Sequence, residues 1–122
     1  MKVLTREQRE LLLNNGREQQ KVKGTKAEKD FWPVVKLFYP AGAATWLLTE
    51  IDPEDEDIAT GLCDLGMGFP EFGTVRLSEL SEFKGIGGLG IERDKFFEAK
   101  GPISAYIAAA DAAGCIVEEL AQ

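Results

Sequence analysis

The sequence contains no histidine among its 122 residues. Histidine is the commonest general acid or base near neutral pH, and it activates the nucleophile in Ser-His and Cys-His pairs. It is also a ligand in nearly every catalytic zinc site. Its absence therefore excludes histidine-based acid–base chemistry, these nucleophile pairs and nearly all zinc hydrolase sites.

Cysteine is also scarce, with only Cys63 and Cys115, and the two do not have a CxxC or zinc-ligand spacing. Both lie in apolar stretches, where a free cysteine behaves as a small buried hydrophobic residue. We therefore expect two buried thiols in a reducing cytoplasm, with a disulfide between them as the alternative.

Long apolar runs are missing as well. No stretch approaches the roughly 20 apolar residues that cross a bilayer, and the N-terminal MKVLTREQRE lacks the apolar region of a signal peptide. The sequence therefore predicts a cytoplasmic protein without membrane contact. Its length, with 44% hydrophobic and 29% charged residues, predicts one domain over residues 1–122.

Basic residues are rare after residue 36. Residues 1–36 carry a formal charge of +4 and residues 37–122 carry −11, which gives −7 for the chain. An acidic body of this kind repels nucleic acid and attracts basic surfaces. The charge pattern therefore favours a protein partner with a basic surface and argues against nucleic-acid contact by the acidic body.

The N-terminal segment, residues 1–16, is expected to be helical. Thr5 and Gln8 have the spacing of a capping box, which predicts a helix over about residues 6–14. Asn14-Asn15-Gly16 predicts its end. Residues 17–30 are polar and rich in lysine, so we expect an exposed loop or arm there.

Residues 31–122 are expected to form a sheet core with a C-terminal helix. Apolar and β-branched patterns predict four strands, over residues 34–39, 45–51, 58–65 and 74–77. Residues 91–97 fit either a fifth strand or a helical turn. In the second strand, Trp46 and Leu48 share one face while Leu47 and Ile51 share the other, which predicts a central strand covered on both sides.

Two further helices complete the predicted fold. Ser78 is expected to cap a short helix over residues 79–83, and Pro102 and Gly114 delimit a C-terminal helix over about residues 103–113. Short turns between strands favour hairpin pairing. The sequence thus predicts a single α+β domain with a mainly antiparallel sheet of four to five strands and a helix at each end.

An acidic turn is expected between the second and third strands. Its six acidic residues have no basic residue among them: Glu50, Asp52, Glu54, Asp55, Glu56 and Asp57. Their spacing does not match an EF-hand loop. Three interpretations remain open: a solvated hairpin tip, an acidic surface that binds Lys and Arg of a partner, and a site for a bound cation.

A second group of acidic residues includes Asp64 and Glu71, in the glycine-spaced segment GLCDLGMGFPEFG. Pairing the strands about the acidic turn puts Ala59 opposite Glu50 and Cys63 opposite Trp46. Asp64 then lies roughly 23 Å from the turn, so the two acidic groups cannot share one metal ion.

Asp64, Glu71 and Asp94 could instead gather at the far end of the hairpin. Together they could hold Mg²⁺ for phosphoryl chemistry. The interpretation that we favour is structural, with Asp64 paired to Arg93 or bonded to the backbone N–H groups of its own turn.

Four segments carry a resemblance to a known family: PVVKLFYP, ATWLLTEIDPEDEDIATGLCDLG, GFPEFGTVRLSELSEFKG and GLGIERDKFF. Together they resemble the uncharacterised family called domain of unknown function 2958, over most of the chain from Asp30 onward. Its members are borne on plasmids and integrative elements, near conjugation and anti-restriction genes. The resemblance implies a cytoplasmic accessory protein of mobile DNA, and it supplies no agreed activity and no catalytic residues. Lys95 and Phe96 stand where the family more usually has Leu-His, so no histidine-dependent role is expected there.

We therefore expect a protein without cofactor or metal that acts by binding a partner's basic surface. The resemblance and the acidic body together imply a host defence complex as the partner, either CRISPR or restriction machinery, and thus an anti-CRISPR or anti-restriction role. A second hypothesis is a metal-dependent nuclease or phosphoesterase that uses Asp64, Glu71 and Asp94. A third is a regulatory module whose basic N-terminal arm touches DNA.

Overall fold

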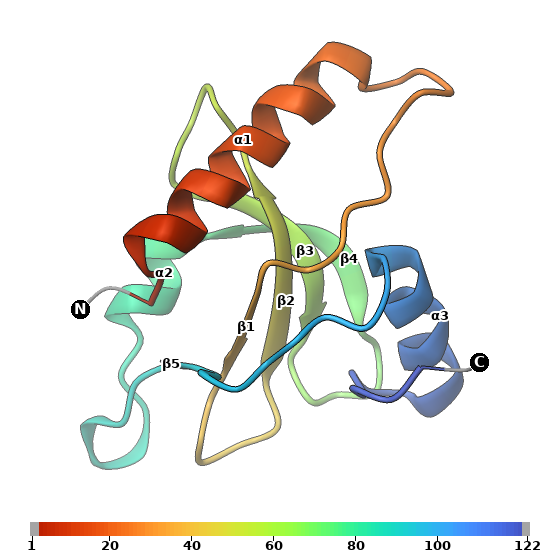
Figure 1. Ribbon diagram of the computed structural model, residues 1–122. Helices are drawn as coiled ribbons and strands as arrows, with labels where there is room; N and C mark the ends of the chain where they lie inside the picture. Colours follow the sequence, from red (N-terminus) through yellow and green to blue (C-terminus); the bar gives the residue numbers. More distant parts are fainter. Residues whose placement is uncertain (1–2, 121–122) are drawn as a thin grey trace.

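The computed structural model describes residues 3–120 as a five-stranded antiparallel sheet with helices on both faces (Figure 1). Its strands are β1 (Val35–Phe38), β2 (Thr45–Ile51), β3 (Ile58–Asp64), β4 (Glu71–Arg76) and β5 (Glu92–Arg93). Their order across the sheet is β4-β3-β2-β1-β5. The helices are α1 (Arg6–Val22), α2 (Leu77–Glu82) and α3 (Ile103–Ala113), with a short 3₁₀ turn, η1 (Ile86–Gly88).

The predicted α+β class, the antiparallel sheet and the helix at each end are confirmed. Residues 1–2 and 121–122, the ends of the expected domain range, lie outside the described residues. No helix in residues 3–120 is both long and apolar enough to cross a bilayer.

Helix α1 begins where the sequence predicts but ends later. The Thr5 hydroxyl accepts a bond from the Gln8 N–H at 3.1 Å, and Gln8 Oε1 accepts one from the Thr5 N–H at 3.0 Å. The predicted end at residue 14 is wrong, because α1 runs through Gly16 to Val22 and includes part of the expected arm. Gly16 serves close packing instead, since a Cβ built there would lie 1.8 Å from the backbone oxygen of Ile51.

Strand β2 is the middle strand, as its two apolar faces predict, and Trp46 pairs with Cys63 as expected. The expected pairing of Glu50 with Ala59 is wrong. The register shifts between Leu48 and Glu50, so that Glu50 pairs with Thr60 instead. A shift of this kind is a β-bulge, in which one strand contains an extra residue.

The extra residue is Thr49, which is buried and held from two sides. Its carbonyl accepts a bond from Asn15 Nδ2 of α1 at 2.9 Å, and its hydroxyl donates to the Thr60 carbonyl at 3.2 Å. Because of the bulge, Ile51 lies in the same apolar cluster as Leu48. Strict alternation along the strand predicted that Ile51 would lie on the opposite face. The prediction for Ile51 was wrong because the bulge reverses the facing of the residues that follow it.

The two faces of the sheet bury separate apolar clusters. Helices α1 and α2, with the residues that precede α1, cover the cluster around Leu12 and Leu48. Helix α3 and the segment that follows it cover the cluster around Leu47 and Tyr106. Leu47 and Leu48 are fully buried neighbours on opposite faces, and burying a leucine side chain contributes about 1.5–3 kcal/mol.

The two later helices depend on distant residues for their N-termini. Helix α2 begins at Leu77, so the prediction that Ser78 is its N-cap was wrong. The N–H and the hydroxyl of Ser78 instead donate to the Asp57 carboxylate at 2.8 and 2.7 Å. Helix α3 spans residues 103–113 as predicted, and Asp30 accepts a bond from the Ser104 N–H at 3.0 Å. Acidic residues remote in sequence therefore satisfy the free N–H groups of both helices.

Replacing Gly16 with alanine tests the close packing of α1 on the hairpin. Gly→Ala inside a helix normally stabilises it by about 1 kcal/mol. Here the new Cβ would overlap the Ile51 carbonyl, so we expect Gly16→Ala to lower the free energy of unfolding by about 1–3 kcal/mol. Urea unfolding measures the change, with exposed Asn14→Ala as the control that should not destabilise. A Gly16→Ala variant more stable than the parent would contradict this packing.

Candidate functional site

The six acidic residues around the β2–β3 turn are largely committed to partners within the molecule. Asp52 accepts a bond from the Glu54 N–H at 2.8 Å, and Asp55 accepts one from the Asp57 N–H at 3.2 Å. Such bonds from a side chain to a backbone N–H two residues later are typical of tight turns. They fix the shape of the turn and use one oxygen of each carboxylate.

Basic residues remote in sequence also neutralise part of this turn. Arg76 Nη1 lies 3.5 Å from Asp55 and 3.6 Å from Asp57, and Arg9 Nη2 lies 3.5 Å from Glu56. The two hydrogen bonds from Ser78 and the charge of Arg76 hold the pKa of Asp57 below its usual range. Of the charges near the tip, that of Glu54 is the most open to a partner, because its side chain is exposed and forms no ion pair within residues 3–120.

Glu50 lies in a hollow of about 310 Å³ between the end of α1 and the β2–β4 strands, which Asp52 and Glu54 of the turn also line. Thr60 and Thr74 line the same hollow, together with Lys23 of the segment after α1. Burial raises the pKa of Glu50, although the charge of Lys23 and a bond from Thr49 oppose the rise. Glu50 therefore lies in a partly enclosed site that it shares with two acidic residues of the turn.

Asp64, Glu71 and Asp94 do not form a shared site. The buried carboxylate of Asp64 accepts bonds from the Gly66 N–H at 2.8 Å and the Ile116 N–H at 2.9 Å. Asp94 lies 3.4 Å from Lys36 Nζ and accepts a bond from the Phe96 N–H. Across residues 3–120, no three His, Cys, Asp or Glu side chains are placed to hold a metal ion.

The structural interpretation of Asp64 holds in one of its two forms. Asp64 is bonded to the N–H groups of its turn, and it also joins the β3–β4 turn to the segment after α3. The alternative pairing with Arg93 is wrong, because Arg93 Nη1 donates to the Val3 carbonyl at 3.1 Å. The segment that precedes α1 passes beside β5, and this position gives Arg93 a backbone carbonyl as its partner in place of Asp64.

Lys36 joins two acidic residues at the opposite edge of the sheet. Its Nζ lies 2.6 Å from Glu118 and 3.4 Å from Asp94. Burial by itself would lower the pKa of Lys36, but the hydrogen bonds and charges of Glu118 and Asp94 raise it. This cluster ties the C-terminal segment to β1 and uses the carboxylates of Asp94 and Glu118 in ion pairs.

The two thiols differ in accessibility. Cys63 is half-buried beside Trp46, whereas Cys115 is exposed, so the prediction of two buried thiols is wrong for Cys115. Both are free, so the disulfide alternative is wrong. Burial, and next the charge of Glu71, raises the pKa of Cys63 to about 11, which leaves its thiol protonated near neutral pH.

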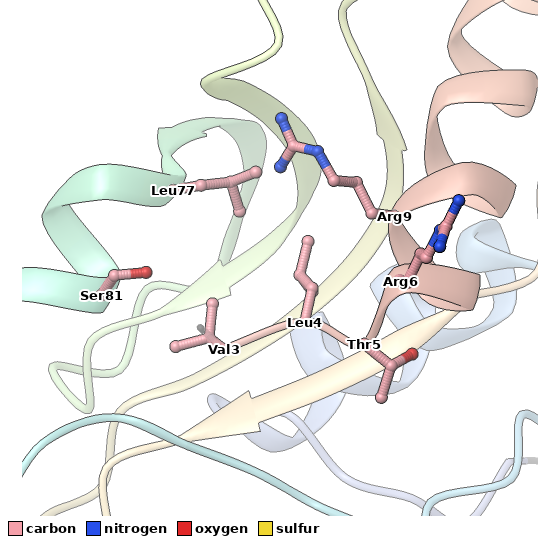
Figure 2. Close-up of a pocket in the computed structure, with 7 residues that line it drawn as sticks. All are labelled: Val3, Leu4, Thr5, Arg6, Arg9, Leu77 and Ser81. Carbon is pink, nitrogen blue, oxygen red and sulfur yellow. The ribbon is translucent and has the colours of Figure 1, made fainter. Parts of the chain in front are cut away.

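One hollow of about 410 Å³ separates α2 from the start of α1 (Figure 2). Val3, Leu4 and Leu77 form its apolar wall. Its polar groups are the hydroxyls of Thr5 and Ser81 and two arginines. Arg6 and Arg9 already lie against glutamates, at 3.6 Å from Glu10 and 3.5 Å from Glu56. No base lies among the residues that line it, so it lacks the paired groups of a nucleophilic site.

A more apolar groove lies on the same face of the sheet, beyond the part that α1 covers. It has a volume of about 490 Å³ and nine lining residues: Tyr39, Ala44, Trp46, Leu65, Val75, Glu79, Leu80, Phe83 and Ile91. Leu65 and Phe83 are 60% and 45% exposed, so apolar side chains project at its margins. The Tyr39 and Phe83 rings pack edge to face, 5.3 Å apart.

No pattern in the sequence indicates this groove. Its residues come from five separate segments, and no spacing in the chain relates Trp46 to Phe83. The available signal was local: Leu65 and Phe83 are large apolar residues at the ends of a predicted strand and helix, where polar residues are usual. Exposed apolar groups that gather on one surface are typical of binding sites.

The free acidic residues lie around the groove and the neighbouring strand β4. Glu79 lines the groove, and Glu71 lies close enough to Cys63 to raise its pKa. A shallow hollow beside Phe69 contains Glu71 together with Asp111 of α3. Acidic side chains therefore lie along β4 on both faces of the sheet. The arginines at the acidic turn do not neutralise them, because these arginines are already paired with residues of the turn.

A sequence profile described as "Protein of unknown function (DUF2958)" matches residues 3–117. This range includes α1, the sheet, the groove and α3, so the likeness extends beyond the segments after Asp30 that carry the resemblance. Searches of curated proteins and of solved structures give no match to the chain.

Asp64→Asn tests the structural role of the buried carboxylate. The variant keeps the shape but replaces one acceptor oxygen with an N–H donor, which would face a backbone N–H. We expect the free energy of unfolding to fall by about 1–3 kcal/mol, because a buried backbone donor loses its partner. Exposed Asp111→Asn is the matched control and should leave the urea midpoint unchanged. Equal stability of the two variants would contradict the role assigned to Asp64.

Alkylation of the native protein tests the difference between the thiols. Iodoacetamide near neutral pH should modify Cys115 at least about tenfold faster than Cys63, because only a thiolate reacts and burial protects Cys63. Mass spectrometry of the two tryptic peptides measures both rates, and raising the pH toward 11 should accelerate Cys63. In denaturant the two rates should converge. Equal rates in the native protein would show that Cys63 is not protected.

Proposed function

The chain belongs to the DUF2958 family of proteins of unknown function, and from that premise we propose that it acts by binding a partner protein and not by catalysis. The observation that carries the proposal is the apolar groove beside α2, open at Leu65 and Phe83 and bordered by Glu79. Apolar and aromatic anchors inside a charged margin are typical of protein-binding surfaces.

The charge of the surface specifies the partner's chemistry. Glu71, Glu79 and Glu82 are exposed and form no ion pair among the residues that the structure describes. We infer a partner that inserts an apolar side chain into the groove and places Lys or Arg residues against these glutamates. Opposite charge of this kind steers encounter and selects the partner, while the apolar contact supplies most of the affinity.

The acidic turn has a supporting part in this proposal. Asp55, Asp57 and Glu56 are already paired with Arg76 and Arg9, which reduces the charge that they offer. Glu54 remains exposed at the tip. Glu54 also lines the hollow that contains Thr74 of β4, so its charge lies beside the edge strand.

We further propose that the partner is a host defence complex, either CRISPR or restriction machinery. This part rests on the mobile-DNA setting that the resemblance of the sequence implies, and on the −11 charge of residues 37–122. That charge is complementary to the basic surface of a complex that binds nucleic acid. In such a setting the protein is a cytoplasmic anti-CRISPR or anti-restriction inhibitor.

Affinity capture from cells that carry such defence systems tests the binding function. The tagged parent should retain a defence protein, and retention should weaken as salt rises, because exposed charges are screened over about 8 Å at physiological ionic strength. The double variant Leu65→Ser with Phe83→Ser should lose it. Phe96→Ser, at an equally large apolar residue that is 93% exposed outside the groove, is the matched control and should retain it. Retention by all three proteins would contradict the role of the groove.

Plasmid establishment tests the inhibitory role separately. Expression of the parent should raise the transformation efficiency of a targeted plasmid in cells with an active CRISPR or restriction system, and the double variant should not. An untargeted plasmid provides the control. No rise in any defended strain, with binding intact, would contradict the defence partner and leave the binding function standing.

A further inference from the structure

Strand β4 forms an open edge of the sheet. It is the end strand in the order β4-β3-β2-β1-β5 and is six residues long. The opposite edge, β5, has two residues, both charged. A short, charged edge strand is a usual protection against strand addition, whereas an exposed strand of this length can template it.

The backbone groups that β4 directs outward follow from the hydrogen bonds of β3. The Ile58 carbonyl accepts a bond from the Asp52 N–H at 2.9 Å, so residue 58 faces β2. Facing alternates along an antiparallel strand, so β3 residues 59, 61 and 63 face β4. Their partners are Val75, Gly73 and Glu71. Phe72 and Thr74 therefore direct their N–H and C=O groups away from the sheet, and within residues 3–120 no other backbone group bonds to them.

The usual obstacles to strand pairing are missing from this edge. Glu71–Arg76 contains no proline and no lysine, and its register with β3 runs without a bulge. Its one basic residue, Arg76, is held against Asp55 and Asp57. Phe72 is 48% exposed, and no atom of residues 3–120 lies within 4 Å of a Cβ built on Gly73, so the strand is uncovered at both residues.

Acidic groups surround this edge on both faces. Thr74 shares its hollow with three of them, Glu50, Asp52 and Glu54. At the other end of the strand, Glu71 shares a hollow with Asp111. Val75, next to Thr74, lines the groove that contains Glu79. An added strand would place its alternating side chains among these carboxylates. The edge therefore combines unpaired backbone groups with negative charge.

We propose that β4 accepts an extended, lysine- or arginine-rich segment of the partner as a sixth strand of the sheet. The inference rests on the proposed binding function and specifies how the partner is held: main-chain bonds to Phe72 and Thr74 give affinity, and basic side chains give selectivity. A second copy of this chain is a poorer occupant, because each copy carries a net charge of −7 and brings the same acids to the interface.

Amide exchange of the intact protein tests the inference with a defined probe. The probe is a blocked peptide of alternating lysine and valine, about nine residues long, which is a usual strand length. On saturation, the amides of Phe72 and Thr74 should exchange at least about tenfold more slowly, because they gain partners. A peptide with glutamate in place of lysine should have no effect. Protection confined to other segments, or protection that grows with protein concentration without peptide, would overturn the inference.

A proline substitution tests the same edge on the partner. Proline is tolerated in an edge strand where the missing N–H faced solvent, so Thr74→Pro should fold and lose one outward donor. Partner affinity should fall about tenfold or more, whereas Thr74→Ala, which keeps the N–H, should stay within about twofold. Thermal unfolding checks that both variants fold; should Thr74→Pro not fold, the exchange experiment on the parent decides.

The two proposals fail in different ways. Capture that is lost with Leu65→Ser and Phe83→Ser but kept at full affinity by folded Thr74→Pro overturns the strand addition and leaves the groove. Capture that no variant reduces overturns both. Loss of capture with Thr74→Pro but not with Thr74→Ala supports a main-chain contact. Both variants lack the threonine side chain, but only Thr74→Pro lacks the backbone N–H.

Discussion

Strand β2 has large apolar side chains on both faces, and burying both faces is the constraint from which the architecture follows. Leu47 and Leu48 are adjacent and fully buried, so each face of the sheet requires its own cover. Helix α1 supplies one cover and α3 the other. Because these helices cover the faces, no helix or strand of residues 3–120 pairs with the outer side of β4, which is left as an open edge.

The close contact of α1 with the hairpin determines which part of this face of the sheet stays uncovered. Gly16 lets the helix lie against Ile51 and Pro53, at the end of the sheet near the acidic turn. The same face is therefore left uncovered at its other end, where Trp46, Leu65 and Phe83 form the groove. Packing at one end of the hairpin and an exposed apolar surface at the other are two consequences of one helix position.

The fold also separates structural charge from available charge. Asp30, Asp57 and Asp64 satisfy backbone N–H groups of α3, α2 and the C-terminal segment, so their negative charge serves stability. Glu71 of β4 and Glu79 beside it form no ion pair within the part of the chain that the structure describes. A count of acidic residues overstates the binding surface, because the carboxylates most concentrated in the sequence are the ones most engaged inside the molecule.

The sequence by itself determined the α+β class, the bounds of β2 and α3, and the central position of β2, because these follow from local periodicity and from residues such as Pro102 and Gly114. It also excluded histidine chemistry. Only the tertiary structure decided that α1 continues past Gly16 and that Thr49 forms a bulge. It also decided that Arg93 bonds to the Val3 carbonyl and not to Asp64, and that Trp46 and Phe83 line one groove. Each of these features depends on contacts between segments that are far apart in the chain. The energies of such contacts cannot be read from a local sequence pattern.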